Sequence, residues 1–122
     1  MNNKRLKYLQ DSYELIKSIP CRSKRLTKYQ KIIISTTANV YGLKTRHVFI
    51  RRRINPLPEI RFICAIHLRE KMILEDIAKL LNLKTHASVL HCIKTFKSFY
   101  DTDKYFKNKA DMIEILIEEK LR

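Results

Sequence analysis

The stretch Leu74 to Phe96, LEDIAKLLNLKTHASVLHCIKTF, decides the fold, because it predicts two short helices joined by a tight polar turn. In its first half the apolar residues fall at helical spacing: Leu74, Ile77, Leu80 and Leu81. The run 82–84 supplies the turn, and Thr85 is suited to cap the second helix. The apolar stripe of that second helix is then Val89, Ile93, Phe96 and Tyr100. This pattern is typical of a helix-turn-helix.

The outer face of the second helix is polar at its start and basic further along. It carries His86, Ala87, Ser88, His91, Lys94, Thr95 and Lys97. Short hydrogen-bonding side chains in the first turn, followed by positive charge, are the layout of a recognition helix that reads base edges in the major groove. A helical hairpin with a solvated basic face would have the same periodicity, so periodicity alone leaves both interpretations open.

The residues themselves favour the first interpretation. Residues 77–92, IAKLLNLKTHASVLHC, resemble without a gap the signature IGxxFGGRDHSTVLHA of the C-terminal DNA-binding domain of the bacterial chromosomal replication initiator DnaA. Agreement in identity or charge covers Ile77, Lys84, His86, Ser88, Val89, Leu90 and His91. The departures are Asn82 and Leu83 for the glycine pair, Thr85 for Asp, Ala87 for a hydroxyl residue and Cys92 for Ala. Weaker matches in the same register extend the resemblance to about residues 33–98: Tyr41-Gly42-Leu43, Val48, Arg52, Arg53 and Arg61.

The resemblance implies an all-α fold, a helix-turn-helix DNA-binding domain of the Trp-repressor or DnaA C-terminal type, here with extra N- and C-terminal helices. It also implies recognition of initiator-type boxes in duplex DNA, with replication or transcription proteins as further candidate partners. The implied base-reading residues are Thr85, His86, Ala87, Ser88 and, reaching into the minor groove, Arg61. The resemblance does not extend to the initiator's motor, because a nucleotide-binding P-loop needs two glycines and this chain has only Gly42.

Composition and charge agree with a small helical DNA-binding protein. Hydrophobic residues make up 45% of the 122 residues, with one Gly and three Pro, which favours an all-α protein. The net charge is +14, and it is placed unevenly: residues 1–58 have a balance of +12 and residues 59–122 of +2. A polyanion is the natural partner of such a field, because each neutralised phosphate releases counterions.

Several basic residues are candidates for phosphate contact. Three consecutive guanidinium groups precede the two-proline stretch at 56–58, and guanidinium forks suit phosphates, although a solvated charge run is the alternative. The candidates are Arg51, Arg52 and Arg53, with Lys84, His91 and Lys94. The basic link 21–25 is open to two interpretations, a solvated connector or a further phosphate contact.

The rest of the chain predicts helices on both sides of the central unit. We expect a basic N-terminal extension over 1–30, the DNA-binding domain over 31–100 and a C-terminal helix over 101–122. The expected helices are Asn3–Ile19 stopped by Pro20, one capped by Thr27 and ended by Gly42, a short one over Thr45–Ile50, one from Pro58 to Lys71, and Asp111–Leu121. The last has an apolar stripe at Met112, Ile113, Leu116 and Ile117, which packs within the chain or pairs 111–121 with a second copy.

Other classes of function are disfavoured. Cys21, Cys64 and Cys92 lack the spacing of a disulfide framework or a zinc site, so we expect free thiols and neither metal nor cofactor. No nucleophile has an adjacent base, and Glu75 and Asp76 are explained by the start of a helix, so we expect no enzyme. With no apolar run near the length of a membrane span, we expect a cytoplasmic, nucleoid-associated protein. A helix-turn-helix transcription regulator and a basic protein that coats nucleic acid without reading sequence remain alternatives.

Overall fold

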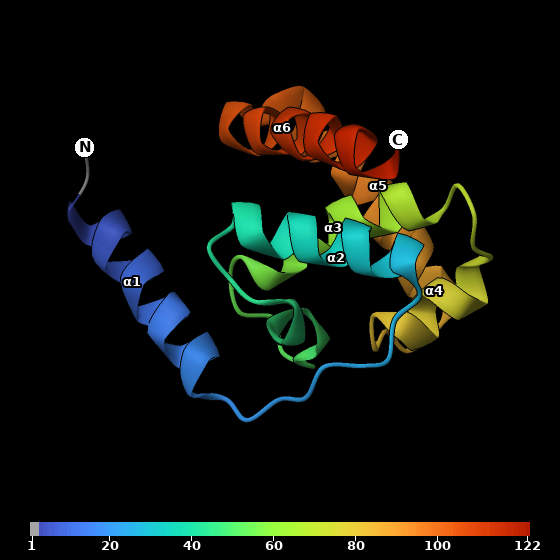
Figure 1. The fold of residues 1–122 in the computed structure, drawn as a ribbon. Helices are drawn as coiled ribbons and strands as arrows, with labels where there is room; N and C mark the ends of the chain where they lie inside the picture. Colours follow the sequence, from blue (N-terminus) through green and yellow to red (C-terminus); the bar gives the residue numbers. More distant parts are fainter. Residues whose placement is uncertain (1–2) are drawn as a thin grey trace.

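A computed structural model describes residues 3–122, with side-chain environments from residue 10 onward, and this part of the chain contains helices and no strands. The elements are α1 (Asn3–Ser18), α2 (Lys28–Val40), the 3₁₀ helix η1 (Thr45–Phe49), α3 (Leu57–Leu68), α4 (Leu74–Leu80), α5 (His86–Thr102) and α6 (Lys104–Leu121) (Figure 1). The all-α prediction is confirmed. The helix expected to run to Lys71 ends three residues earlier, at Leu68.

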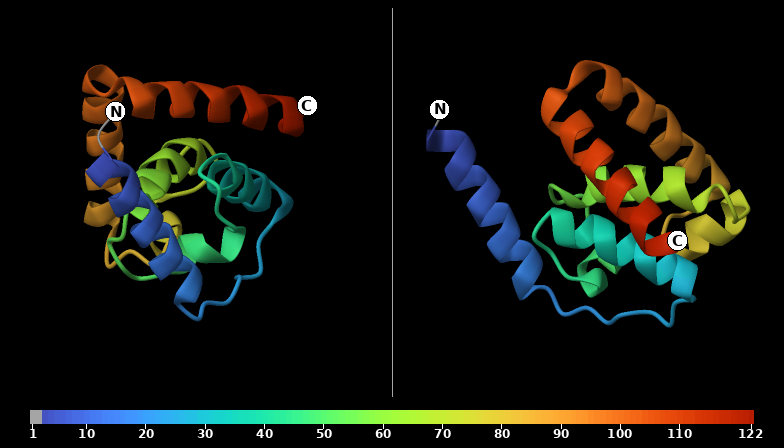
Figure 2. Two further views of the ribbon diagram at one scale, coloured as in Figure 1. Left: turned by 90° about the vertical axis from the view of Figure 1, so that its left-hand side faces the viewer. Right: turned by 45° about the horizontal axis from the view of Figure 1, so that its top comes forward.

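The core lies where α2 and α3 pack side by side, with α5 against α3 and α6 across α2 and α5 (Figure 2). Its fully buried apolar side chains include Ile33, Ile34, Ile60, Ile63, Leu68, Ile77, Leu81, Val89 and Ile113. Each such side chain stabilises the fold by about 1.5–3 kcal/mol relative to exposure. Because the α4–α5 pair contributes Ile77, Leu81 and Val89, its position is fixed by the same core that α2 and α3 form.

The C-terminal helix starts seven residues before the predicted Asp111. Asp103 caps it, since its carboxylate accepts from the backbone N–H groups of Tyr105 (3.0 Å) and Phe106 (3.2 Å). The buried stripe is therefore Phe106, Ala110, Ile113 and Ile117, facing α2 and α5. Of the predicted stripe, Met112 is 53% exposed, and Ile115 beside it is 57% exposed. A homodimer through 111–121 stays a prediction, and Met112 and Ile115 would have to form its apolar contact.

The second helix has both of the predicted end signals. Thr27 and Gln30 form a reciprocal capping box, with the Gln30 N–H 3.2 Å from the Thr27 hydroxyl and the Thr27 N–H 3.1 Å from the Gln30 amide oxygen. At the other end Gly42 has φ +78°, and the Leu43 N–H donates to the carbonyl of Ala38 (2.9 Å). Glycine adopts this left-handed conformation without steric cost, so the predicted C-terminal role of Gly42 is confirmed.

The N-terminal helix lies beside the core, and its N-terminal end points away from it (Figures 1 and 2). Near its C-terminal end Ile16 is fully buried, and the Tyr13 hydroxyl donates to the carbonyl of Tyr41 at 2.5 Å. The side chains of Leu6 and Leu9, predicted to share its apolar stripe, lie outside the described side chains. From Ser18 the extended linker 19–27 crosses the molecule to reach α2. This path carries the linker past the turn between α4 and α5.

Candidate nucleic-acid interface

The turn between α4 and α5 closes on a residue other than glycine in the left-handed conformation. Asn82 has φ +57°, the Leu83 N–H donates to the carbonyl of Ala78 (2.8 Å), and the Asn82 N–H lies 3.4 Å from the carbonyl of Lys79. This is the Schellman pattern, in which two carbonyls of the last helical turn find partners. Asn tolerates the left-handed region better than most residues. The predicted pair of short helices with its turn at 82–84 is therefore present.

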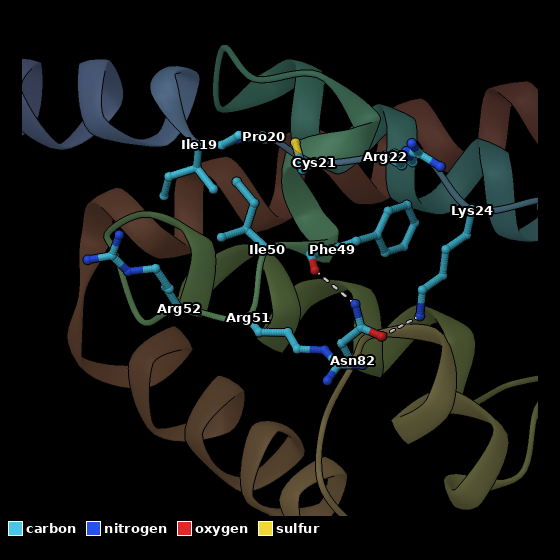
Figure 3. A pocket seen from close by; sticks show the side chains of 10 residues that line it. All are labelled: Ile19, Pro20, Cys21, Arg22, Lys24, Phe49, Ile50, Arg51, Arg52 and Asn82. Atoms are coloured by element: carbon cyan, nitrogen blue, oxygen red, sulfur yellow. Dashed lines mark hydrogen bonds between the residues drawn. The ribbon is translucent and has the colours of Figure 1, made fainter.

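The Asn82 side chain ties this turn to two distant segments. Its amide nitrogen donates to the carbonyl of Phe49 at 2.8 Å, and its amide oxygen accepts from the Lys24 ammonium at 2.5 Å. Lys24 also donates to the carbonyls of Lys79 (2.8 Å) and Leu80 (2.9 Å), at the C-terminal end of α4. A cation at a helix C-terminus is stabilised there by the helix dipole. The network joins the linker, η1 and the turn (Figure 3).

The first turn of α5 presents the residues that the sequence singled out. Thr85, His86 and Ala87 are exposed and Ser88 is half-buried, whereas Val89 and Cys92 on the opposite side are buried. Thr85 has the extended backbone of an N-cap, but its hydroxyl accepts no capping hydrogen bond, so the prediction of a side-chain cap is wrong. The Thr85 hydroxyl therefore makes no hydrogen bond to the first backbone N–H groups of α5. Further along, His91 and Lys94 are exposed, with His91 Nε2 3.4 Å from the Thr95 hydroxyl.

The basic loop presents Arg51, Arg52 and Arg53 to solvent, as predicted, and Lys84 is also exposed. Arg61 lies inside the protein and not on the surface facing a minor groove. It is only 7% exposed, and its guanidinium donates to the carbonyls of Ile50 and Arg52 (3.1 Å for Arg52). Burial lowers the pKa of this guanidinium by disfavouring its charged form. The expected base-reading role of Arg61 is therefore not compatible with its position, and it holds the loop.

A hollow of about 360 Å³ brings the predicted basic loop together with the α4–α5 turn and the linker. It is lined by Ile19, Pro20, Cys21, Arg22, Lys24, Phe49, Ile50, Arg51, Arg52 and Asn82 (Figure 3). Burial lowers the pKa of Lys24, and the positive charge of Arg51 lowers it further. Sequence reasoning left the linker open and missed Lys24 as a partner of the turn. No local pattern could have shown a contact between residues 58 positions apart.

Among the described residues neither a cluster of metal ligands nor a disulfide is present. In this part of the chain no three His, Cys, Asp or Glu side chains gather as metal ligands would, and Cys21, Cys64 and Cys92 are free thiols. Burial raises the pKa of the Cys64 thiol to about 12, which makes it unreactive. Within residues 3–122, every helix is too short or too polar for a bilayer crossing.

Comparison with known proteins adds no relative. The chain matches no protein-family model, and no curated protein or solved structure shows significant similarity to it. Inference about function therefore rests on the exposed start of α5, the basic loop and the turn that joins them.

Proposed function

We propose that this protein binds double-stranded DNA in a sequence-dependent manner, with α4 and α5 acting as a helix-turn-helix and α5 entering the major groove. The observation that carries the proposal is the exposed first turn of α5, where small and hydrogen-bonding side chains stand on a helix fixed to the core by Val89 and Cys92. A major groove about 12 Å wide admits one helix, and the first turn of that helix then faces base edges.

In this proposal the exposed and half-buried residues of this surface divide into two sets. His86 and Ser88 donate to or accept from base edges, and the Ala87 methyl contacts a thymine methyl. The Thr85 hydroxyl, which makes no capping hydrogen bond, also contacts a base edge. The phosphate set is cationic apart from His91, whose imidazole N–H is a hydrogen-bond donor. It consists of Arg51, Arg52, Arg53, Lys84, His91 and Lys94, all of which are exposed. Arg61 acts through the loop that it holds and not through a base.

The residue resemblance described above makes initiator-type boxes the first sites to test. Thr85 cannot supply the carboxylate that accepts from cytosine N4, and Ala87 has no hydroxyl, so the preferred site should differ from the usual box at one or two base pairs. We propose action at the nucleoid in the cytoplasm, together with replication or transcription proteins. Neither origin control nor transcriptional regulation needs a motor in this chain.

The experiment is selection of binding sites from random duplex DNA by the wild type, Thr85→Asp and His86→Ala. The wild type should enrich one motif, and each variant should change its preference at one or two base pairs. Each altered base contact is worth about 1–3 kcal/mol, or one to two orders of magnitude in preference. If all three proteins enrich the same sequence with the same discrimination, α5 does not read bases.

A second candidate function is non-specific coating of nucleic acid. The observation that favours it is the excess of exposed cations on the basic loop and the linker, a charge distribution that binds any duplex. Competition with unrelated duplex DNA separates the two functions. A sequence reader retains a preferred site in excess competitor, and a coating protein does not.

A further inference from the structure

The hollow lined by the linker, the basic loop and the α4–α5 turn has one sign of charge. Among its ten lining residues four are cationic, Arg22, Lys24, Arg51 and Arg52, and none is acidic. Its remaining surface is largely apolar, with the side chains of Ile19, Pro20, Phe49 and Ile50. Positive charge on a low-dielectric surface raises the local concentration of anions.

The four cations are not equivalent. The Lys24 ammonium is already hydrogen-bonded within the protein, because it donates to three oxygens at the end of α4 and in the turn. Arg22, Arg51 and Arg52 are exposed, and none of their side chains has a hydrogen bond or an ion pair with a described residue. Lys24 therefore anchors the linker, and the guanidinium groups keep their donors for a ligand.

The position of the hollow relative to α5 limits what this ligand can be. Asn82 lines the hollow and precedes Thr85 by three residues, so their Cα atoms are at most about 11 Å apart, at about 3.6 Å per residue. That distance is within the width of a major groove, about 12 Å. The hollow is therefore within reach of the phosphates at the edge of a major groove that receives the first turn of α5.

We propose that the rim of this hollow binds the backbone of the DNA duplex that α5 reads, with Arg22 of the linker and Arg51 of the basic loop each contacting a phosphate. The inference rests on the proposed function and deepens it, since it adds the N-terminal linker to the DNA interface. Guanidinium groups suit this ligand because their planar forks donate two parallel hydrogen bonds to phosphate oxygens. Lys24 is a positioning residue, which holds the linker two residues after Arg22.

The test is the salt dependence of binding to the selected duplex, measured by fluorescence anisotropy for Arg22→Gln, Arg51→Gln and the double variant. Loss of one phosphate contact should reduce the slope of log K against log salt by about 0.9. Between 50 and 200 mM salt, the affinity of each single variant should therefore fall by a factor about threefold smaller than that of the wild type. The double variant should reduce the slope by about 1.8, because each arginine contacts its own phosphate and the two losses add. The preferred sequence should stay unchanged.

Arg25→Gln is the matched control, because Arg25 is an exposed arginine of the same linker that does not line the hollow. It should leave the slope unchanged. An unchanged slope in Arg22→Gln, an equal loss in Arg25→Gln, or a double variant no worse than one single variant would overturn the two phosphate contacts. Thermal unfolding should show the same Tm for all variants, since these side chains are exposed.

The two proposals fail in different ways. If the wild type shows no salt-dependent binding to any duplex, the proposed function fails and the phosphate site fails with it. If the wild type binds and reads sequence while Arg22→Gln keeps the wild-type slope, only the phosphate site is wrong and the linker is a connector.

Discussion

Two helices of this protein end in the same backbone motif, closed by different residues. At the end of α2 the left-handed residue is Gly42 (φ +78°), and at the end of α4 it is Asn82 (φ +57°). In both, the next residue donates to the carbonyl five positions back, Leu43 to Ala38 at 2.9 Å and Leu83 to Ala78 at 2.8 Å. The local hydrogen bonding of the two ends is therefore nearly equal, and the difference lies in the side chain.

At Gly42 the motif only ends the helix and turns the chain. A Cβ added there would meet no atom within 4 Å, so no contact depends on the residue being small. At Asn82 the side chain carries two long-range hydrogen bonds, to the carbonyl of Phe49 and from Lys24. Asparagine at the end of α4 therefore has a modest conformational cost, but its side chain fixes the turn before α5 to the rest of the protein.

The largest expected effect is that of Asn82→Ala. It removes both side-chain bonds and places a residue with poor tolerance of positive φ in the left-handed region, so we expect a loss of about 3 kcal/mol in the free energy of unfolding. Asn82→Gly removes the bonds but relieves the backbone, so we expect a loss of about 2 kcal/mol. Urea unfolding at neutral pH measures both. A cost for Asn82→Gly near zero would show that the side-chain bonds do not stabilise the turn.

A smaller effect is expected at Gly42, where only the backbone is at stake. Gly42→Ala should cost about 1 kcal/mol of unfolding free energy, because alanine disfavours φ +78° while its methyl meets no neighbour. Gly42→Asn should cost less than Gly42→Ala, since asparagine tolerates this region. Measured in the same urea series, equal costs for the two variants would mean that more than the backbone conformation is lost at this end.

The smallest expected effect is a loss of stability in acid, and it comes from His47 in the segment that follows Gly42. After Gly42, the buried His47 accepts the Lys44 N–H on Nδ1 at 3.0 Å, and burial, helped by nearby positive charges, lowers the His47 pKa. A pKa lowered by folding means that the unfolded chain binds the proton more readily, so this stability is present above about pH 6.5 and is lost as pH falls through the folded-state pKa.

We therefore compare urea unfolding at pH 7 and pH 5 for the wild type and His47→Asn, whose amide oxygen can accept the same N–H without titrating. The wild type should lose more unfolding free energy on acidification than the variant does. The same loss in both proteins would assign the acid dependence to other groups, such as the half-buried His67, whose pKa burial also lowers.

Periodicity and capping chemistry predicted most of the fold because they are local. The capping box at Thr27, the end at Gly42 and the turn at 82–84 follow from residues within one or two helical turns. The base-reading role predicted for Arg61 came from the family resemblance, which matches residues by their order in the chain and does not show which face of a helix they occupy. Leu57, Arg61, Cys64 and Leu68 form one helical stripe, and all four are buried. The spacing of this stripe places Arg61 on the buried face of α3.

Two other features of the candidate site depend on distant parts of the chain and could not be read locally. The hollow needs the linker, the basic loop and the turn to converge, and the Lys24 bonds span 55 to 58 residues. The start of α6 depends on Asp103, whose carboxylate caps a helix where its sequence position indicates only a break in periodicity. Asp103 begins a helix and does not merely end one, because the residues after it, Phe106 and Ala110, are buried in the core.

The cover that α6 forms over α2 bears on which part of the chain can fold by itself. A fragment cut to residues 31–100 would contain α4 and α5, yet it would lose the packing of α6 against α2 and would leave the carbonyls at the end of α4 without Lys24. Such a fragment has lost apolar burial on one side and a helix cap on the other. The smallest cooperative folding unit is therefore larger than the segment 31–100, and amide protection in α4 should fall when either end of the chain is removed.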